Sequence, residues 1–264
     1  MLLVVDVGNT ETTLGLCDED RVVEHWRVTT DAARTPDEVF LLLRSLILSA
    51  DLVPAAVTGA AIGSVVPAAT QALAEAAARL TGKPAIVVDA RSKLGITLAV
   101  DEPMTVGADR IINTLAASRM YGMDCIVVDL GTATTYDCIT ADGVFLGGVI
   151  QPGVRTSAET LFRRTSKLPA TELVAPQKVI GTRTEECIRA GVVYGAAESV
   201  DGIVRRIKKE WPREQVPKVV ATGGLAEVIE PHCTEIEAIE PDLTLHGLRM
   251  AFRELGGVTV RSPR

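Results

Sequence analysis

Two short segments of the chain have the residue types that bind phosphate: DVGNT at residues 6–10 and DLGT at residues 129–132. Each comes directly after an apolar run that predicts a buried strand. A glycine in such a turn lets backbone N–H groups approach phosphate oxygens without a side chain in the way, and the hydroxyls of Thr10 and Thr132 add further donors. Together the two segments predict a nucleoside triphosphate bound between two similarly built halves.

The aspartates of these segments need a different role, because a carboxylate cannot face a phosphate directly. Asp6 and Asp129 are expected at strand ends, where each is placed to hold a cation or the water ligands of a cation. The alternative interpretation is that both are merely turn-forming Asp-Gly segments. The occurrence of the same segment twice favours phosphate binding.

Two familiar nucleotide-binding sequences are absent from the chain. There is no GxxxxGK(S/T) segment, which argues against a P-loop, and no GxGxxG segment follows the first apolar run, which argues against a dinucleotide-binding fold. A further backbone loop is expected at Gly223 and Gly224, because they directly follow the apolar run at residues 218–222. The phosphate site is therefore expected to have another architecture.

The elements that position these loops are predicted in the same order twice. In both parts of the chain a strand leads into the Asp-x-Gly segment, and a second strand, a turn and a third strand follow. Because the two copies lie about one domain length apart, this order favours an internal duplication over chance, with halves at residues 1–118 and 119–264. The strands are expected at residues 2–6, 12–17, 22–28, 125–129, 134–139 and 144–150.

Helices and further strands are expected between and after these strands. Thr35 and Glu38 have capping-box spacing, with Pro36 at the first helical position. Thr182 and Glu185 have the same spacing before a long helical segment. The further strands are expected at residues 60–66, 85–89 and 218–222, and the helices at 67–80 with Gly82 as the stop, 105–121 with Asp109 and Arg110 near the start, and 182–211.

Composition limits the classes of protein to which the chain can belong. With 47% hydrophobic and 23% charged residues, it can bury a sizeable interior and is expected to be globular. The formal net charge of -7 disfavours nucleic acid as a partner, because proteins bind the phosphate backbone of nucleic acids through clustered Lys and Arg. The five cysteines have neither paired nor metal-ligand spacing, so each is interpreted as a small core residue in a reducing cytoplasm.

Two apolar stretches could be interpreted as a signal peptide or a membrane-spanning segment. The start, MLLVVDVG, has no basic region, and Asp6 cuts the apolar run short of a signal peptide. Residues 52–74 carry no charge, but prolines, glycines and polar residues interrupt them. They are interpreted as a buried loop, a strand and the start of a helix, and no membrane association is expected.

Two halves with Asp-x-Gly hairpins and a later TGG loop are the pattern of the actin, hexokinase and Hsp70 superfamily. The resemblance implies an α/β fold with two duplicated ribonuclease-H-like (actin-like ATPase) domains and a nucleotide cleft between them. More narrowly, the chain resembles the type III pantothenate kinases over nearly its whole length. The matching segments are DVGNT at 6–10, WR at 26–27, SVVP at 64–67, VGADR at 106–110, DLGTATT at 129–135, GGVIQPG at 147–153, KLP at 167–169, TEE at 184–186 with Arg189 and Gly191, and TGG at 222–224.

The family resemblance implies transfer of the γ-phosphate of ATP to the primary hydroxyl of pantothenate, which gives 4′-phosphopantothenate and begins coenzyme A synthesis. Asp109 is then the base, Asp6 holds Mg²⁺, and Asp129 lies at a site for a monovalent cation, K⁺ or NH₄⁺. The residues implied for pantothenate are Gly107, Ala108, Arg110, Thr184 and the position of Val100. The residues implied for ATP and its phosphates are Asp6, Val7, Gly8, Asn9, Thr10, Gly131, Thr132, Gly223 and Gly224.

Two features of the family concern the shape of the substrate site. In the family, a Thr at the position of Thr184 reaches pantothenate from the neighbouring subunit, so the resemblance implies a homodimer with a shared site. Many members also carry a Tyr shortly before the GADR segment that helps to close the pantothenate pocket. This chain has Val100 there and no aromatic residue in the stretch 96–106, so the pocket is expected to differ.

The motif residues also have ordinary interpretations, and the whole chain has two alternative functions. By residue type alone, Asp109 is a first-turn Asp favoured by the helix dipole, and Arg110 forms a surface ion pair. The chain could be a sugar kinase of the same superfamily, but the segment at residues 106–110 argues against this. It could also be a nucleotide-binding regulator without catalytic activity, but the presence of Asp6, Asp109 and Asp129 argues against an inactive enzyme.

Overall fold

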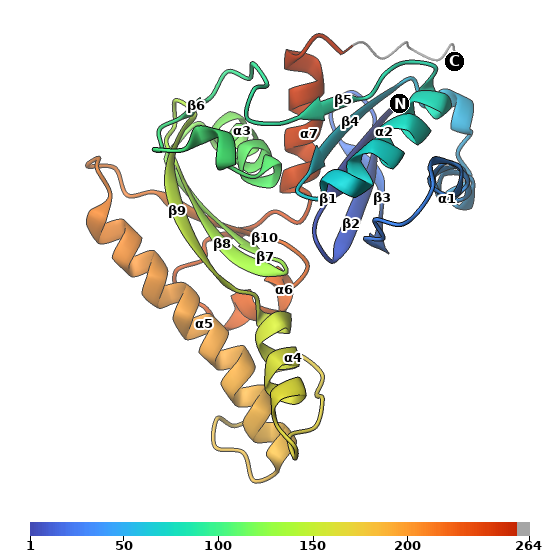
Figure 1. Cartoon of the computed structure of the whole chain (residues 1–264). Coiled ribbons are helices and arrows are strands. Elements are labelled where there is room, and N and C mark those ends of the chain that lie inside the picture. The colour runs from blue at the N-terminus through green and yellow to red at the C-terminus, as the bar shows by residue number, and fades with distance from the viewer. Residues whose placement is uncertain (258–264) are drawn as a thin grey trace. The chain divides into compact units, whose positions relative to one another are not determined.

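A computed structural model describes residues 1–257, which form two compact units (Figure 1). The first unit contains Met1–Met120, Gly143–Phe145 and the described chain from Asp242 onward. The second unit contains Tyr121–Asp142 and Leu146–Pro241. The chain therefore returns to the first unit after completing the second, while the halves expected at 1–118 and 119–264 stay a prediction.

The first unit is built around a five-stranded mixed sheet. Its elements are β1 (Leu2–Val7), β2 (Glu11–Cys17), β3 (Val22–Thr29), α1 (Pro36–Ser49), β4 (Gly59–Ser64), α2 (Pro67–Thr81), β5 (Ile86–Val88), β6 (Thr97–Leu98), α3 (Ala108–Tyr121) and α7 (Leu243–Glu254), with 3₁₀ turns at Pro54–Ala56 and Pro103–Thr105. The strand order is β3-β2-β1-β4-β5. β1 pairs antiparallel with β2 and parallel with β4, so it lies in the middle of the sheet.

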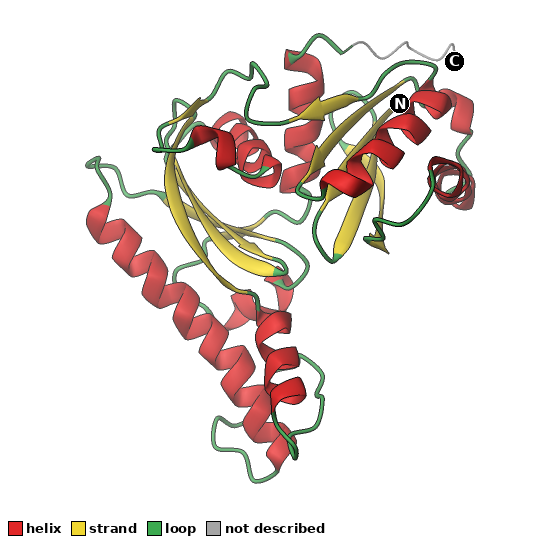
Figure 2. Ribbon diagram, in the orientation of Figure 1, coloured by secondary structure: helices red, strands yellow, loops and turns green. Residues whose placement is uncertain are grey.

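Helices cover both faces of this sheet, because β1 carries apolar residues on both of its sides. On one face, Val5 belongs to a buried cluster with Leu43 of α1 and the alanines of α2. On the other face, Val4 belongs to a cluster with Ile112 of α3 and Leu248 of α7. The unit is thus a three-layer α/β/α structure (Figure 2), and the apolar residues of β1 are buried.

The helices α1 and α2 begin and end as the sequence predicts. Thr35 caps α1, because its Oγ1 accepts from the Glu38 N–H at 3.3 Å, and the Glu38 carboxylate accepts from the Thr35 N–H at 2.8 Å. Pro36 is the first helical residue. α2 stops at Gly82, whose φ of +70° is left-handed and whose N–H donates to the carbonyl of Ala78.

The second unit is built around β7, the strand that carries the second phosphate segment. Its elements are β7 (Cys125–Leu130), β8 (Ala133–Ile139), β9 (Val144–Pro152), α4 (Val154–Arg164), α5 (Thr184–Glu210), β10 (Lys218–Thr222), α6 (Ala226–Ile229) and β11 (Ala238–Ile239), with a 3₁₀ turn at Glu230–His232. The long helix α5 packs on the sheet through Val193, Ala197 and Val200, against Ile126 and Val128 of β7.

The two sheets have the same strand order. The second sheet runs β11-β10-β7-β8-β9, and then β6, which pairs with the first residues of β9 inside the first unit. Reversed and without β6, this matches the order β3-β2-β1-β4-β5 of the first sheet. β7, like β1, pairs antiparallel with the next strand and parallel with a later one. The shared topology supports the duplication that the repeated segments predicted.

Several elements were not predicted, although two of them carry a helical pattern. In α4, the apolar residues Val154, Ala158, Leu161 and Phe162 have the i, i+4, i+7, i+8 spacing of a helix stripe, although only Val154 is buried. In α7, the buried residues Leu245, Leu248 and Phe252 have the i, i+3, i+7 spacing of a helix. β6, β11 and α6 are two to four residues long, which is too short for periodicity to identify.

Three details of the sequence interpretation are wrong. The carboxylate that caps α5 belongs to Glu186, not Glu185, and accepts from the N–H groups of Thr182 and Arg183 at 2.9 and 3.3 Å. The helix expected from residue 105 begins at Ala108, because a 3₁₀ turn precedes it. Cys187 is exposed rather than a core residue, although all five cysteines are free and Cys17, Cys125 and Cys138 are buried.

The uncharged stretch 52–74 has the form that the sequence predicts. It contains the 3₁₀ turn Pro54–Ala56, strand β4 and the first half of α2. Within residues 1–257, no helix combines the length and the apolar character that crossing a bilayer requires.

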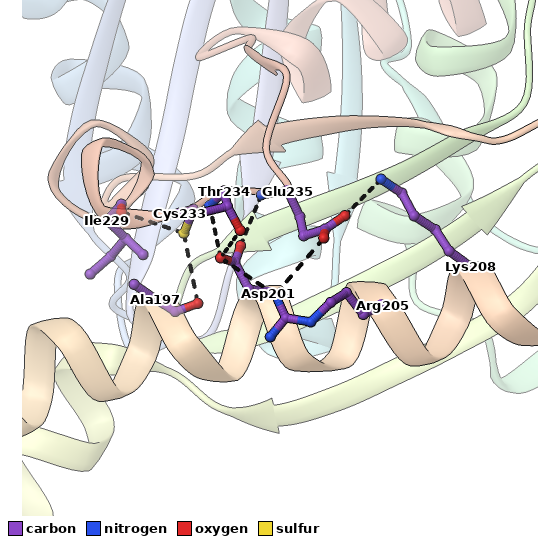
Figure 3. Close-up of polar contacts among 8 residues, drawn as sticks. All are labelled: Ala197, Asp201, Arg205, Lys208, Ile229, Cys233, Thr234 and Glu235. Atoms are coloured by element: carbon purple, nitrogen blue, oxygen red, sulfur yellow. Dashed lines mark hydrogen bonds and ion pairs between the residues drawn. The ribbon is translucent and has the colours of Figure 1, made fainter.

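A buried carboxylate on α5 fastens the segment between the 3₁₀ turn and β11 to the helix (Figure 3). Asp201 accepts hydrogen bonds from the N–H and the hydroxyl of Thr234, at 2.8 and 2.5 Å, and from the N–H of Glu235 at 3.0 Å. Arg205 and Lys208, one and two turns further along α5, pair with the Glu235 carboxylate at 3.8 and 2.8 Å. A single helix face therefore holds the turn at 233–235.

Replacing Asp201 with alanine is expected to lower the free energy of unfolding by roughly 2–4 kcal/mol, because buried donors lose their acceptor. Asp201→Asn keeps one acceptor oxygen and is expected to lose less. Urea unfolding of the three proteins measures the difference, and a stability of Asp201→Ala equal to that of the unchanged chain would contradict the role of this carboxylate.

Candidate active site

The first phosphate segment lies at the end of β1 in the first unit. Asp6 is the penultimate residue of the strand and is flanked by Thr13 of β2 and Gly63 of β4. The N–H of Gly8 donates to the carbonyl of Glu11 at 3.0 Å and closes the turn between β1 and β2. Asn9 and Thr10 at the tip of the turn are exposed, so their donors are accessible to a ligand.

Asp109 lies in the first turn of α3, where the family resemblance placed the base. Its Oδ1 accepts from the N–H of Arg110 at 2.9 Å. The carbonyl of Gly107 accepts from the N–H of Ile111 at 3.2 Å, so Gly107 immediately precedes the helix. A methyl group on Gly107 would lie 2.4 Å from Asp109 Oδ1, which means that the carboxylate occupies the space above this glycine. Gly107 is thus required by the position of Asp109.

Val65 connects Asp109 to the first phosphate segment. A methyl group on Gly107 would lie 3.4 Å from the Val65 side chain, and the N–H of Val65 donates to the carbonyl of Val7 at 3.1 Å. Val65 directly follows β4, which pairs with β1 up to Val7. The structure therefore brings together the segments 6–10 and 107–110, and Val65, which sequence reasoning used only as part of the SVVP motif, lies between them.

Asp109 and its neighbour Arg110 have unusual surroundings for charged residues. Burial raises the pKa of the Asp109 carboxyl above its usual range, while the hydrogen bond from the Arg110 N–H and the charge of Arg110 act in the opposite direction. The guanidinium carbon of Arg110 lies 4.9 Å from the ring centre of Phe145, a fully buried residue of β9. Sequence reasoning missed Phe145, since nothing local marks an aromatic residue that supports a distant arginine.

In the second unit, Asp129 lies between the two glycine loops that follow β7 and β10. β10 pairs with β7 so that Thr222 is next to Asp129. Gly223 follows with a φ of +91°, and a methyl group there would lie 2.5 Å from Asp129 Oδ1 and 2.7 Å from the N of Leu130. A methyl group on Gly131 would lie 3.5 Å from the same oxygen. Asp129, Gly131 and Gly223 are therefore brought together.

The remaining part of the second phosphate segment is attached to the start of α4. The carbonyl of Thr132 accepts from the N–H of Gly153 at 3.1 Å and from the hydroxyl of Thr156 at 2.7 Å. These bonds fix the backbone of Thr132 and leave this residue exposed. Gly224, the second glycine of the loop after β10, is also exposed.

Thr184 and Val100 belong to other segments of the chain than these two groups of residues. Thr184 is the exposed first residue of α5 and lines a groove of about 730 Å³ between α4 and α5. The walls of this groove are mainly apolar, with Gln151 and Ser199 among its polar residues. Val100 is half-buried just after β6 in the first unit. The predicted residues thus divide between the units, with Val100 in the first unit and Thr184 in the second.

A cation at Asp6 or Asp129 would not be surrounded by a cluster of acidic, His or Cys ligands in the described residues 1–257. Among residues 1–257, no group of three or more His, Cys, Asp or Glu side chains is arranged to hold a metal ion. Mg²⁺ in phosphoryl-transfer sites is commonly held by one or two carboxylates, substrate phosphates and water. Single carboxylates at the ends of β1 and β7, next to exposed glycine turns, fit that kind of coordination.

The comparisons with known proteins identify the family. The model of the family described as type III pantothenate kinase matches residues 2–206. A protein of Acidothermus cellulolyticus with the same description is 46% identical over 253 residues, which cover 96% of this chain and 98% of that protein.

Solved structures define the fold independently. A Baf family transcriptional activator of Campylobacter jejuni superposes with a TM-score of 0.60 at 15% identity, over 96% of this chain and 98% of that one. The activator of the 2-hydroxyisocaproyl-CoA dehydratase of Clostridium difficile, determined with bound ADPNP, superposes with a TM-score of 0.58 at 13% identity, over 96% and 95%. At these identities the likeness concerns the fold alone, and it confirms two domains of the actin-like ATPase type. The family model matches residues 2–206, and 46% of the aligned residues are identical to the Acidothermus cellulolyticus protein over 96% of the chain, so the chain belongs to the type III pantothenate kinase family.

Proposed function

We propose that the two Asp-x-Gly segments bind the phosphates of ATP and that Asp109 is the base that activates the primary hydroxyl of pantothenate. As a member of its family, the chain is a pantothenate kinase and acts in coenzyme A synthesis. The observation that carries the site assignment is the position of the half-buried Asp109 carboxylate over Gly107, which lies next to Val65, while the N–H of Val65 donates to the carbonyl of Val7 at the end of β1.

The proposed phosphoryl transfer depends more on the alignment of the reacting groups than on the strength of the base. Phosphoryl transfer passes through a loose transition state, so alignment and neutralisation of charge lower the barrier more than early proton removal does. Asp109 accepts the hydroxyl proton late, and a carboxylate with a raised pKa is a better acceptor at that point than an ordinary one. Arg110, whose guanidinium lies over Phe145, is assigned to bind the transferred phosphate or the carboxylate of pantothenate.

The two aspartates at the strand ends have separate assignments in this proposal. Asp6 would hold Mg²⁺, and the donors of Asn9 and Thr10 would bind the phosphates. Asp129 would lie at a site for a monovalent cation, K⁺ or NH₄⁺, and Gly131, Thr132 and the loop of Gly223 and Gly224 would form the second group of phosphate contacts. When bound, the cations neutralise the negative charge that the phosphates bring together.

We assign the chain to a homodimer in which Thr184 completes the pantothenate site of the partner subunit. Thr184 is exposed and lines the mainly apolar groove of α4 and α5, and Val179 and Ile180 just before it are exposed by 68% and 86%. Apolar side chains so exposed are typical of surfaces that another protein covers.

Mixing two inactive variants tests the shared site. Asp109→Asn and Thr184→Val each remove one component, and a hybrid dimer keeps one complete site of its two. Random exchange of subunits is expected to restore about a quarter of the activity of the unchanged enzyme. A monomeric mass in solution, or no restoration after verified exchange, would remove this assignment.

The compartment proposed for this activity is the cytoplasm. The five cysteines of the chain are free thiols, and a reducing compartment keeps thiols in this state.

An assay of ADP release with a panel of acceptors tests the function itself. Pantothenate is compared with sugars and small hydroxy acids, because a sugar kinase of the same superfamily would use the same phosphate segments. We expect stimulation by pantothenate only. Stimulation by a sugar alone would favour the sugar kinase, and ATP binding without turnover on any acceptor would favour a regulatory protein.

A further inference from the structure

Thr30, the residue directly after β3, contacts two residues of the first phosphate segment, Gly8 and Thr10. Its hydroxyl donates to the carbonyl of Gly8 at 2.7 Å, and its N–H donates to the carbonyl of Thr10 at 2.9 Å. No motif marks Thr30 in the sequence, and it reaches the segment only because β3 pairs with β2 in the antiparallel meander. One residue thus holds two of the carbonyl groups of the turn.

These contacts decide which way the peptide groups of the turn face. In a trans peptide the carbonyl of one residue and the N–H of the next point in opposite directions. With the Gly8 carbonyl directed to Thr30, the N–H of Asn9 points away from Thr30. A carbonyl turned outward would instead meet the phosphate oxygens with like partial charge, which weakens binding.

The hydroxyl of Thr30 is itself held by a second threonine. Thr12 Oγ1 lies 2.8 Å from Thr30 Oγ1, and Thr12 is only 5% exposed. Because the Thr30 proton is used on the Gly8 carbonyl, Thr12 must donate to Thr30. The two hydroxyls form a relay from the buried side of β2 to the turn, and such chains of hydrogen bonds strengthen one another.

We propose that Thr30 is a positioning residue that keeps the backbone of residues 8–10 in the orientation that binds the phosphates of ATP. The inference rests on the proposed function of this segment and adds a residue that acts through the backbone of the segment. Thr12 supports Thr30 through the hydroxyl relay.

Thr30→Val tests the inference, because valine has the shape of threonine, lacks the hydroxyl and keeps the N–H that bonds to Thr10. We expect the KM for ATP to rise about tenfold and the KM for pantothenate to stay unchanged, as for the loss of one hydrogen bond that orients a loop. Thr30→Ser keeps the hydroxyl and is expected to behave like the unchanged enzyme. Thr12→Val, which removes only the first link of the relay, is expected to raise the KM for ATP less.

Thr81→Val is the matched control, because the Thr81 hydroxyl also donates to a backbone carbonyl, that of Ala77, but at the end of α2. An unchanged KM for ATP in both Thr30→Val and Thr12→Val, with only thermal stability reduced, would overturn the inference. Asp6→Asn separates this failure from a failure of the proposed function. A raised KM for ATP in Asp6→Asn with no effect in the threonine variants refutes the positioning role alone, whereas no effect in Asp6→Asn refutes the phosphate segment as well.

Discussion

Asp109→Asn is expected to lower pantothenate-dependent ADP release by about 10²–10⁴-fold, the range typical of a lost general base. ATP binding is expected to remain measurable, because the amide keeps the size of the carboxylate and its contact with Gly107. Steady-state kinetics and isothermal titration with a non-hydrolysable ATP analogue measure the two quantities. Turnover equal to that of the unchanged enzyme would remove the assignment of Asp109.

The raised pKa of Asp109 adds two expectations that a purely structural residue would not produce. The base must be ionised, so kcat/KM is expected to fall as the pH falls through a pKa above the usual range of Asp. In Asp109→Asn, the residual kcat/KM is expected to lack this decrease at acidic pH. Between the ordinary and the raised pKa, the folded state binds more protons than the unfolded state, so the stability that this group contributes is lost as pH rises. Asp109→Asn is therefore expected to be at least as stable as the unchanged enzyme at pH 7.

Gly223→Ala is expected to weaken ATP binding by at least about tenfold and to lower the free energy of unfolding by about 2–4 kcal/mol. A φ of +91° is strained for any residue with a Cβ, and the added methyl group would lie 2.5 Å from Asp129 Oδ1 and 2.7–2.8 Å from backbone atoms of Leu130. Because backbone cannot move aside as a flexible side chain does, the loop after β10 must shift away from Asp129.

Gly202→Ala is the matched control in the same unit. A methyl group on Gly202, inside α5, would have no atom within 4 Å apart from the neighbouring backbone of its own helix, and alanine is the better helix former. We expect unchanged ATP binding and equal or higher stability for this control. ATP affinity in Gly223→Ala equal to that of Gly202→Ala would show that the contact of Gly223 with Asp129 does not matter for the nucleotide.

Local signals predicted much of the fold. The continuous apolar runs identified β1 and β7, because a strand covered on both faces needs apolar residues on both sides. The capping box of α1 and the stop at Gly82 were found because both depend on residues within one turn. The helix α4 escaped prediction although Val154, Ala158, Leu161 and Phe162 have helical spacing, because polar and charged residues surround this stripe and favoured the interpretation of a polar stretch.

The residue types and spacing of the sequence determined that two Asp-x-Gly segments follow two buried strands, and that the chain belongs to a family with Asp109 in its motif. Only the tertiary structure decided the neighbours of these residues. Val65 lies beside Gly107, Phe145 lies beneath Arg110, Gly223 lies against Asp129, and Thr30 holds Gly8. Each contact joins residues that are far apart in sequence and depends on the order and register of the strands, which a local pattern of side chains does not encode.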